Sequence, residues 1–363
     1  MYTIVQQFDI ERQVPAGIDT CIQGIVRHQY LLSGSLQILG STTNSEHSLG
    51  DPLTTSPAEV DFVPVVNLDH SNQVRAIPHS VRLMAGVARY AASKLRASDA
   101  IQAHRLEVGV ACHALAPKVP SIQFLHPDGV TSNQTGSDSF WRFAPWAYGS
   151  IEKLLKRAER VVVFNPDGAS RLQEAGVNAV FAPTWYDENT YYGPREPRGS
   201  GRTALWVGRI ESQKDPLLAL EVLSSLSPDW RLMVVGSGSM TGQMARAVHE
   251  MNLSSRVEFV GPVPRTMVAE LMRSADVLLM TSHYEGVPRV MMEALACGLP
   301  VAATQESDTI NVLPSDCVAM DRNPASLRSC VEKAVGRSSK ECSDSVNQYS
   351  EAKVLEAIYG SLV

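Results

Sequence analysis

The chain has 363 residues, of which 44% are hydrophobic and 19% charged, and its formal net charge at pH 7 is −6. A single hydrophobic core rarely grows beyond about 250–300 residues, so this length favours two domains. The negative net charge excludes a general nucleic-acid binder, which would carry a broad basic surface, although it leaves a local basic site open.

Nothing in the sequence predicts a membrane span or an export signal. No run of about eighteen apolar residues occurs, and the N-terminus lacks a basic region followed by a long apolar stretch. The six cysteines are scattered without a Cys-x-x-Cys pair, which favours reduced, buried thiols over a disulfide framework or a zinc ribbon. We therefore expect a cytoplasmic protein.

In the first half, apolar runs alternate with segments of helical period, the pattern of parallel α/β units. Strands are predicted near 3–8, 36–40, 61–67, 100–103, 121–125, 160–164 and 179–182. Helices are predicted near 18–32, 79–96, 146–158 and 167–174, and a loop rich in Ser, Thr, Asn and Pro near 41–58.

A composition break follows at Tyr186–Arg202, where three glycines and two prolines cannot continue a helix or a central strand. Beyond this linker, strands are predicted near 203–207, 230–235, 257–260, 277–281 and 301–303, and a helical stretch near 346–362. The predicted fold is α/β with two Rossmann-like parallel-sheet domains. The first is residues 1–185, with 347–363 packing back on it, and the second is 203–346. Ligands are expected in loops at the carboxyl ends of strands, facing the cleft between the domains.

The segment Ala275–Thr304 carries the clearest chemical signal: a buried strand, a polar loop, a helix, a tight turn and another buried strand. Glu285 is placed where the loop meets the helix, and Glu293 eight residues later on that helix, roughly 12 Å further along its axis. That separation is too long for a paired acid and base, but it suits two acceptors at opposite ends of an elongated polyhydroxyl ligand. The amides of Gly286 and Val287 at the helix N-terminus would favour a phosphate.

This segment resembles the Glu-x7-Glu signature of glycosyltransferase family 4, whose members have the GT-B fold, and Ala294–Val301 fits the same pattern. The resemblance implies that Glu285 contacts hydroxyls of the donor sugar and that Glu293 contacts the ribose of the nucleotide. It covers most of Thr203–Ala303 in detail and the first half of the chain only loosely.

A second motif places two cations after a strand that ends in glycine. Gly208 lets backbone approach a ligand closely, and Arg209 and Lys214 can together offset the charge of a diphosphate. In the resembling family this arrangement binds the donor diphosphate and stabilises it as the leaving group.

Two further loops of the second half resemble nucleotide-binding loops of the family. Gly236 and Gly238 follow a strand, although the next glycine, Gly242, does not complete a dinucleotide fingerprint. Val263 stands after another strand, in a loop whose backbone reads the base in the family. For both loops an ordinary structural turn is an equal alternative.

In the first half, Gly17 lies in a segment that resembles the family's glycine loop, with Ala16 at the usual second glycine. His126 resembles the strand-end histidine that faces the donor sugar and helps to stabilise positive charge in the transition state, with Asp128 as a weaker candidate. The family's Asn-Gly before the linker is Thr184-Trp185 here, and Gln305–Thr309 replaces its glycine pair. Donor preference and the acceptor side are therefore open.

These motifs predict a retaining hexosyltransferase that moves a sugar from a UDP- or GDP-sugar to a glycan or lipid-linked acceptor, as in glycan or cell-envelope biosynthesis. No Asp-x-Asp occupies a plausible metal loop, so neither a metal nor another cofactor is expected. With no placed nucleophile, the acceptor would attack on the face from which the diphosphate leaves. A nucleotide-sugar epimerase and a non-catalytic nucleotide-sugar-binding protein remain alternatives.

A basic surface of the first half raises one more hypothesis. Arg82, Arg89 and Arg96 recur every seven residues on the predicted helix 79–96, so they should share one helix face. A second basic cluster lies at Lys153–Arg160. Either surface could hold the protein on the anionic inner face of a membrane, and an ordinary solvated face is the alternative.

Overall fold

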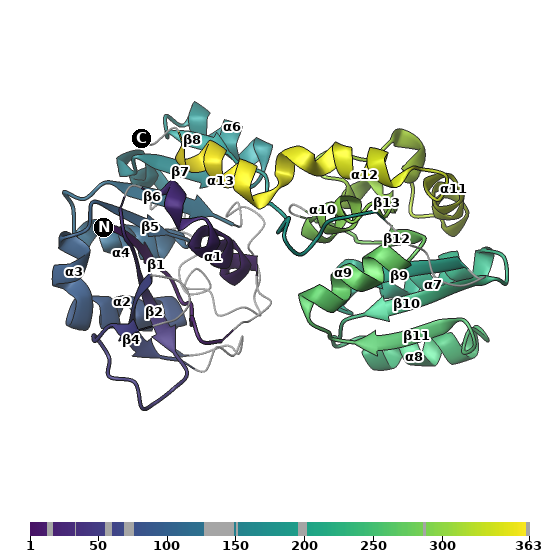
Figure 1. Cartoon of the computed structure of the whole chain (residues 1–363), viewed down its shortest axis with the longest axis horizontal. Coiled ribbons are helices and arrows are strands. Elements are labelled where there is room, and N and C mark those ends of the chain that lie inside the picture. Colours follow the sequence, from purple (N-terminus) through teal and green to yellow (C-terminus); the bar gives the residue numbers. More distant parts are fainter. Residues whose placement is uncertain are drawn as a thin grey trace. The chain divides into compact units, whose positions relative to one another are not determined.

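The structure is a computed structural model that describes residues 1–12, 17–32, 34–54, 60–68, 76–126, 149, 152–194, 202–285 and 288–360. The chain divides into two compact units (Figure 1). Unit 1 comprises Met1–Pro183 and Leu355–Val363, and unit 2 comprises Thr184–Val354. The boundary therefore lies just before the predicted linker, and residues 347–354 group with unit 2.

Unit 1 is built on an eight-stranded sheet in the order β3-β4-β2-β1-β5-β6-β7-β8, parallel except for β3, which runs antiparallel to β4. Nearly every residue of its central strands is buried, which is why these strands are rich in apolar residues. The strands are β1 (Tyr2–Val5), β2 (Leu36–Thr42), β3 (Leu53–Thr54), β4 (Val60–Asn67), β5 (Ala100–Ala103), β6 (Ser121–Leu125), β7 (Arg160–Val163) and β8 (Ala179–Phe181).

A local signal in the sequence marks the start of one helix in unit 1. Asn165 caps one helix by accepting a hydrogen bond from the amide of Gly168, with Pro166 in its first turn. The helices are α1 (Gly17–Arg27), α2 (His79–Gly86), α3 (Ala92–Arg96), α4 (Leu106–Leu115) and α6 (Pro166–Glu174), with a π-helical turn at Val87–Ala91 and a 3-10 helix at Lys153–Arg157.

Two predictions for unit 1 are corrected. Helix α4 was not predicted, because its residues are apolar on every side and show no helical period. The π-helical turn interrupts the helix predicted over 79–96 and shifts the helical phase, so Arg82 and Arg96 do not keep to one face. Arg82 donates a hydrogen bond to the carbonyl of Asn67 after β4, whereas Arg96 donates to the carbonyl of Leu115 at the end of α4.

Unit 2 contains a fully parallel six-stranded sheet in the order β11-β10-β9-β12-β13-β14. Alternate residues of β9 face opposite cores: Ala204 and Trp206 pack in one apolar cluster and Leu205 in the other. The strands are β9 (Arg202–Val207), β10 (Trp230–Val235), β11 (Val257–Gly261), β12 (Val277–Met280), β13 (Val301–Thr304) and β14 (Val318–Ala319), of which the two-residue β14 was not predicted.

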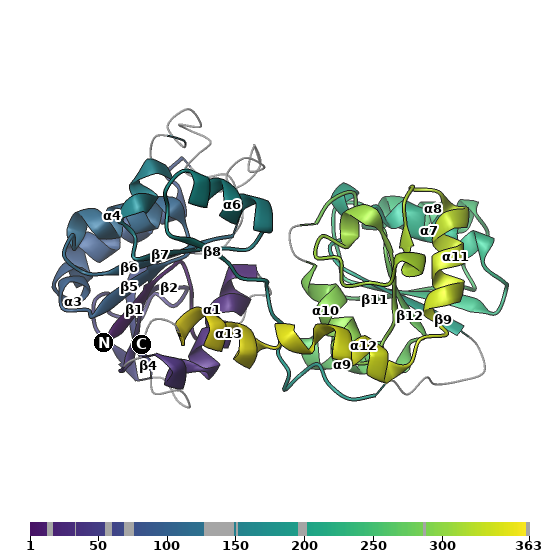
Figure 2. The same cartoon turned by 90° about the horizontal axis from the view of Figure 1, so that it is seen from above.

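Helices cover both faces of this second sheet. Figure 2 shows α7, α8 and α11 on one face and α9, α10 and α12 on the other, in agreement with the two apolar clusters. These helices are α7 (Pro216–Ser225), α8 (Thr241–Glu250), α9 (Arg265–Ser274), α10 (Arg289–Ala296), α11 (Pro324–Ala334) and α12 (Ser339–Val346).

The C-terminal segment is shorter and more broken than the predicted helix 346–362. Helix α12 ends at Val346, a 3-10 turn covers Asn347–Tyr349, and α13 (Glu351–Tyr359) follows. The last residues of α13 pack in unit 1, where Arg160 donates to the carbonyl of Ile358. In the part of the chain that the structure describes, no helix is long and apolar enough to cross a bilayer.

Candidate functional site

The order of strands in unit 2 brings two chemically rich loops together. The chain runs from β9 outward through β10 to β11, then returns to the other side of β9 as β12. Strand order therefore reverses between β9 and β12, and open α/β sheets bind ligands beyond the carboxyl ends of strands at such a reversal. The loop after β9 carries Gly208, Arg209 and Lys214, and the loop after β12 carries Glu285.

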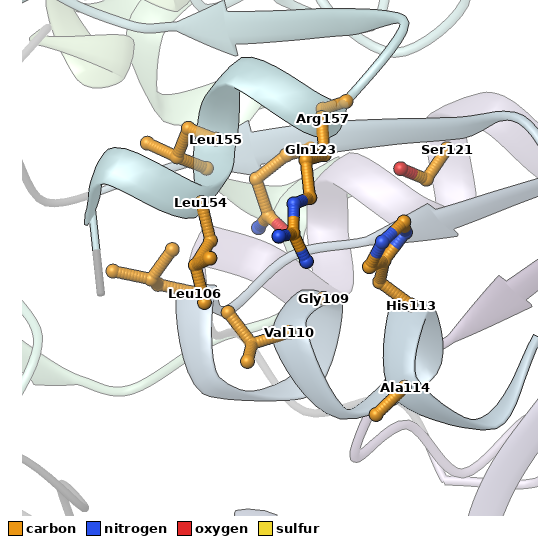
Figure 3. A pocket seen from close by; sticks show the side chains of 11 residues that line it. Leu106, Gly109, Val110, His113, Ala114, Ser121, Gln123, Leu154, Leu155 and Arg157 are labelled. Carbon is orange, nitrogen blue, oxygen red and sulfur yellow. The ribbon is translucent and has the colours of Figure 1, made fainter. Parts of the chain in front are cut away.

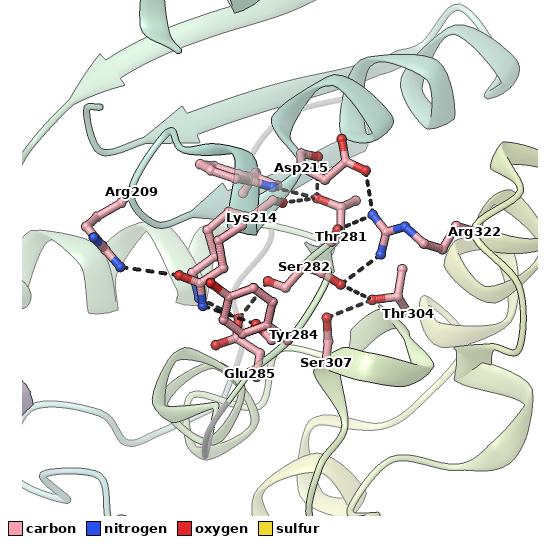
Figure 4. Close-up of polar contacts among 12 residues, drawn as sticks. Arg209, Lys214, Asp215, Thr281, Ser282, Tyr284, Glu285, Thr304, Ser307 and Arg322 are labelled. Carbon is pink, nitrogen blue, oxygen red and sulfur yellow. Dashed lines mark hydrogen bonds and ion pairs between the residues drawn. The ribbon is translucent and has the colours of Figure 1, made fainter. Parts of the chain in front are cut away.

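Lys214 and Glu285, which are 71 residues apart in sequence, form an ion pair in which Nζ lies 2.5 Å from Oε1 (Figure 4). The hydroxyl of Ser282 donates to the same Oε1 at 2.6 Å. Their side chains are 19% and 9% exposed, so water screens the pair only partly. Among the described residues Oε2 of Glu285 accepts no hydrogen bond, and Lys214 uses one of its three N–H donors, so both groups retain capacity for a polar ligand.

Arg209 is exposed and makes a weaker contact. Within the described chain its one side-chain hydrogen bond is to Oε1 of Gln213, at 3.4 Å. The side-chain amide of Gln213 donates to the carbonyl of Tyr284 at 3.1 Å, and the backbone carbonyl of Gln213 accepts from the amide of His283, so the two loops are tied together. The guanidinium of Arg209 is thus close to the Lys214 turn and keeps most of its donors for another partner.

A partly buried polar clamp holds the two loops in register, and sequence reasoning missed it. Arg322, which follows β14, donates to the backbone carbonyls of Thr281 and Ser282 at 2.8 Å and to the carboxylate of Asp215 at 2.5 Å. The Thr281 hydroxyl lies 2.8 Å from the carbonyls of both Lys214 and Asp215. Arg322 therefore fixes the backbone of the two loops from which the side chains of Lys214 and Glu285 extend.

Only part of this clamp left a signal in the sequence. Asp215 caps α7 by accepting from the amide of Leu218, and Asp-Pro at a helix start is a readable signature. Its backbone is left-handed, with φ of 44°, which a non-glycine residue adopts only where its surroundings hold it. Arg322 carries no such signal, because its role arises from contacts with residues that are 40, 41 and 107 positions away in the chain.

The structure separates the predicted glycines into two kinds. A Cβ on Gly236, whose φ is +130°, would lie 1.9 Å from the carbonyl oxygen of Gly208, and a Cβ on Gly238 would lie 2.3 Å from that of Ile210. Both positions thus have a structural reason to be glycine. A Cβ on Gly208 would meet its nearest atoms, in Lys214 and Trp206, at 3.8 Å, an ordinary contact. Packing within the protein therefore does not require glycine at 208.

Glu293 lies apart from the Lys214–Glu285 pair, on the buried side of α10. Burial raises the pKa of its carboxyl to about 7, although the positive charges of Arg289 and Arg265 and a hydrogen bond with Tyr191 oppose that rise. Val263 follows β11 and packs at the edge of the same apolar cluster as Tyr191. Helix α10 begins at Arg289, so Glu285 precedes the helix and does not stand at its start as predicted.

Several predicted residues fall where little is described. Asp128, Gly286 and Val287 lie outside the described residues, and Pro288 stands directly before α10. Gly17 is the first residue of α1, and the segment before it, 13–16, is outside the described residues as well.

His126 stands directly after β6 in unit 1, beside a histidine that sequence reasoning missed. His104 follows the neighbouring strand β5, and its Nδ1 lies 2.9 Å from Nε2 of His126. With Cys21, these histidines place three potential metal-ligand atoms within 4.8 Å of one another. The two ring nitrogens already face each other as a hydrogen-bonded pair, so a metal would have to separate them, and we assign the pair to hydrogen bonding.

A pocket of about 160 Å³ also opens in unit 1, between α4 and the 3-10 helix Lys153–Arg157 (Figure 3). His113, Gln123 and Arg157 are its larger polar residues, and the rest of its lining is mainly apolar. None of the predicted site residues lines it. The pocket brings together none of the charged groups of the two motifs, so the loops after β9 and β12 remain the candidate site.

Residues 194–313, which contain both loops, match the family described as glycosyl transferases group 1. The chain is 30% identical over 154 residues to lipopolysaccharide 1,6-galactosyltransferase of Escherichia coli strain K12, covering 41% of each chain. It therefore spans about two fifths of the length of that relative.

Two solved structures are similar over nearly the whole chain. Sucrose-phosphate synthase from Thermosynechococcus elongatus has a TM-score of 0.76 at 18% identity, covering 99% of this chain and 98% of that one. Anabaena HepE in complex with UDP-glucose has a TM-score of 0.71 at 15% identity, with the same coverage. This chain has the GT-B fold. The predicted fold is thereby confirmed.

The contrast between Gly236 and Gly208 predicts opposite effects on stability. Gly236→Ala should lower the free energy of unfolding by about 1–3 kcal/mol or more, because the new methyl group meets a backbone carbonyl and the residue is held at positive φ. Gly208→Ala should stay within about 0.5 kcal/mol of the parent chain. Chemical denaturation of the two variants side by side is the measurement, and equal losses would contradict the assignment.

The raised pKa of Glu293 predicts a pH-dependent effect on stability. Its folded pKa of about 7 exceeds the ordinary value of 4.5, so the stability that the protonated form contributes is full below pH 4.5 and is lost as pH rises through 7. Glu293→Gln, which cannot ionise, should therefore unfold with a free energy up to about 3 kcal/mol higher than the parent at pH 8. Denaturation curves at pH 5 and pH 8 test this, and a gain that is larger at pH 5 would refute it.

Proposed function

We propose that this chain is a retaining, metal-independent glycosyltransferase of the hexosyltransferase type. It moves a sugar from a nucleoside diphosphate sugar to the hydroxyl of a glycan or lipid-linked acceptor. The observation that carries the proposal is the Lys214–Glu285 ion pair. It joins the cationic loop and the first glutamate of the Glu-x7-Glu segment, two motifs with separate positions in the sequence, at the strand-order reversal of unit 2.

In this proposal the cations bind the diphosphate and the glutamate orients the sugar. Arg209 and the remaining N–H donors of Lys214 contact the phosphate oxygens and stabilise the charge that develops as the diphosphate leaves. Oε2 of Glu285 accepts from a sugar hydroxyl, while Oε1 stays with Lys214 and Ser282. The absence of a side chain at Gly208 leaves room beside Lys214 for the phosphates.

The acceptor hydroxyl attacks the anomeric carbon on the face from which the diphosphate departs, so the configuration is retained. The bond from the anomeric carbon to the diphosphate oxygen breaks, a bond to the acceptor oxygen forms, and the departing phosphate oxygen takes the acceptor proton. The chain's own contribution is orientation and electrostatic stabilisation. We assign His126 and the backbone of Gly17 to contacts with the donor sugar, as the resemblance to the family implies.

Glu293 accepts hydrogen bonds from the ribose hydroxyls, with the backbone beside Gly236 and Val263 bordering the nucleotide. A carboxylate that accepts two hydroxyl groups must be ionised, so nucleotide binding competes with the proton that burial favours on Glu293. Affinity for the nucleotide should consequently increase as the pH rises through 7.

The donor is proposed to be a UDP-sugar, because HepE, which shares the fold, was solved with UDP-glucose. A role in cell-envelope or glycoconjugate synthesis is supported by the 154-residue segment of this chain that is 30% identical to a lipopolysaccharide galactosyltransferase. A GDP-sugar remains the second choice, since no base-specific side chain stands out in the sequence.

The proposal predicts that nucleotides bind and that turnover depends on Arg209. UDP or a UDP-sugar should raise the melting temperature by mass action, more than GDP or ADP. With the stabilising UDP-sugar, release of UDP should require an added acceptor, and Arg209→Ala should reduce turnover by about 10²–10³-fold. Gly208→Ala should weaken UDP binding in calorimetry without loss of stability.

Arg328→Ala is the matched control, because Arg328 is an exposed cation of unit 2 paired with Glu332 on α11. Lys214→Ala is a poorer test, since it leaves the carboxylate of Glu285 buried without its counter-ion and so costs stability as well. Sugar interconversion without acceptor would instead identify an epimerase. Nucleotide binding without any turnover would identify a binding protein.

We further propose that unit 1 rests on an anionic membrane when the acceptor is lipid-linked. Ile77, Val81 and Tyr90 are 57%, 39% and 38% exposed, and all three lie on or next to the segment that carries Arg82 and Arg89. The guanidinium of Arg89 lies 5.3 Å from the centre of the Tyr90 ring. Apolar side chains next to exposed cations are the composition that interfacial helices use.

Vesicle flotation tests this docking. The chain should float with vesicles rich in phosphatidylglycerol at low salt, less at high salt, and not with phosphatidylcholine alone. Arg89→Gln should lower the partition coefficient by about fivefold, the equivalent of 1 kcal/mol per cation near the surface. Arg328→Gln, with the same change of charge in unit 2, should not. Failure to float with anionic vesicles at low salt would rule docking out.

A further inference from the structure

A chain of buried hydrogen bonds leads through unit 1 to His126. The hydroxyls of Tyr2 on β1 and Tyr359 on α13 donate to Oε1 of Gln102, at 2.6 and 2.7 Å. Nε2 of Gln102 lies 2.7 Å from Nε2 of His104, and Nδ1 of His104 lies 2.9 Å from Nε2 of His126. Four elements from both ends of the chain thus converge on one imidazole ring.

Burial keeps most groups of this chain of hydrogen bonds, which we call the relay, in their neutral form. Tyr2, Gln102, His104 and Tyr359 are all buried. Burial raises the pKa of both phenols, which keeps their hydroxyls protonated, and lowers the pKa of His104 to about 3, which keeps its ring neutral. A neutral imidazole has one nitrogen that donates and one that accepts.

The direction of each hydrogen bond then follows from the one before it. The amide oxygen of Gln102 only accepts, and it takes both phenol protons, so the amide nitrogen points to His104 and donates. Nε2 of His104 is therefore the acceptor, and its proton sits on Nδ1. That proton is donated to Nε2 of His126, which leaves His126 with its own proton on Nδ1.

We infer that Gln102 and His104 are positioning residues that hold His126 as the neutral Nδ1–H tautomer. Stacking adds to this hold: the His126 ring lies 4.6 Å from Phe164 and 5.2 Å from His104, centre to centre, at interplanar angles of 23° and 20°. A second proton on Nε2 of His126 would face the N–H of His104, so the relay opposes the imidazolium form.

The consequence for chemistry rests on the proposed function. His126 acts as a hydrogen-bond donor through Nδ1 and not as a general base through Nε2, whose lone pair His104 occupies. A neutral ring also adds no positive charge beside a sugar that becomes cationic in the transition state, where an imidazolium would repel it. The departing diphosphate therefore acts as the general base that takes the acceptor proton.

The tautomer can be measured on the full-length chain whether or not it transfers sugar. Nitrogen-15 NMR of histidine-labelled protein reports which ring nitrogen carries the proton, with the His126 signals assigned by their loss in His126→Asn. We expect the proton on Nδ1 of His126. A proton on Nε2, or a ring that takes up a second proton as readily as an exposed histidine, would overturn the inference.

Three variants separate positioning from simple structural support. Gln102→Glu turns the amide donor into an acceptor, so it should reverse the relay and move the His126 proton to Nε2. Tyr2→Phe leaves Tyr359 on Oε1 and should not. His104→Asn keeps an N–H donor near the position of Nδ1 and should preserve the Nδ1–H tautomer of His126. An unchanged His126 tautomer in a folded Gln102→Glu chain would overturn the inference.

Activity provides the second readout. With the stabilising UDP-sugar and its acceptor, Gln102→Glu should lower kcat at least tenfold and change the donor KM little, while Tyr2→Phe and His104→Asn stay within a few-fold of the parent. A parent chain with the expected tautomer but no transfer would contradict the proposed function and leave the relay intact. Normal kcat in Gln102→Glu with a reversed tautomer would show that His126 does not serve the reaction through Nδ1.

Discussion

The reversal of strand order between β9 and β12 is the constraint on which the candidate site depends. Parallel strands end at the same edge of a sheet, so the loops after two adjacent strands start side by side. Here the loops belong to segments 71 residues apart, and the reversal is the reason that Lys214 can reach Glu285. Without that adjacency, each would be an ordinary surface charge.

Adjacency alone does not set the geometry of two loops, and unit 2 uses partly buried polar contacts to do so. Arg322 ties two carbonyls after β12 to the Asp215 carboxylate at the start of α7, and Thr281 bridges back to the Lys214 turn. The left-handed backbone of Asp215 is held by this clamp. The loops after β9 and β12 are therefore kept in register before any ligand arrives, which lowers the ordering cost of binding.

Unit 1 repeats the same logic with different chemistry. Strands β5 and β6 are neighbours, and a histidine directly follows each strand, so His104 and His126 meet for the same reason that Lys214 and Glu285 do. In unit 2 the pairing is ionic and partly open to water. In unit 1 the pairing is part of a chain of hydrogen bonds between neutral groups, which begins at two buried phenols. It determines which ring nitrogen carries the proton and adds no charge.

The sequence by itself determined the α/β class, the two sheets and most of the strands, because buried parallel strands are continuous apolar runs that need no partner to be recognised. It also determined Glu285, Glu293, Arg209 and Lys214 as candidates, since each lies in a motif of fixed local spacing. Tertiary structure decided the rest. Helix α4 has no polar face to give it a period, and the π-helical turn at Val87–Ala91 leaves no local signature. Arg322, Gln102 and His104 gain their roles only from partners distant in the chain, and a contact of that kind depends on strand order, which no local pattern encodes.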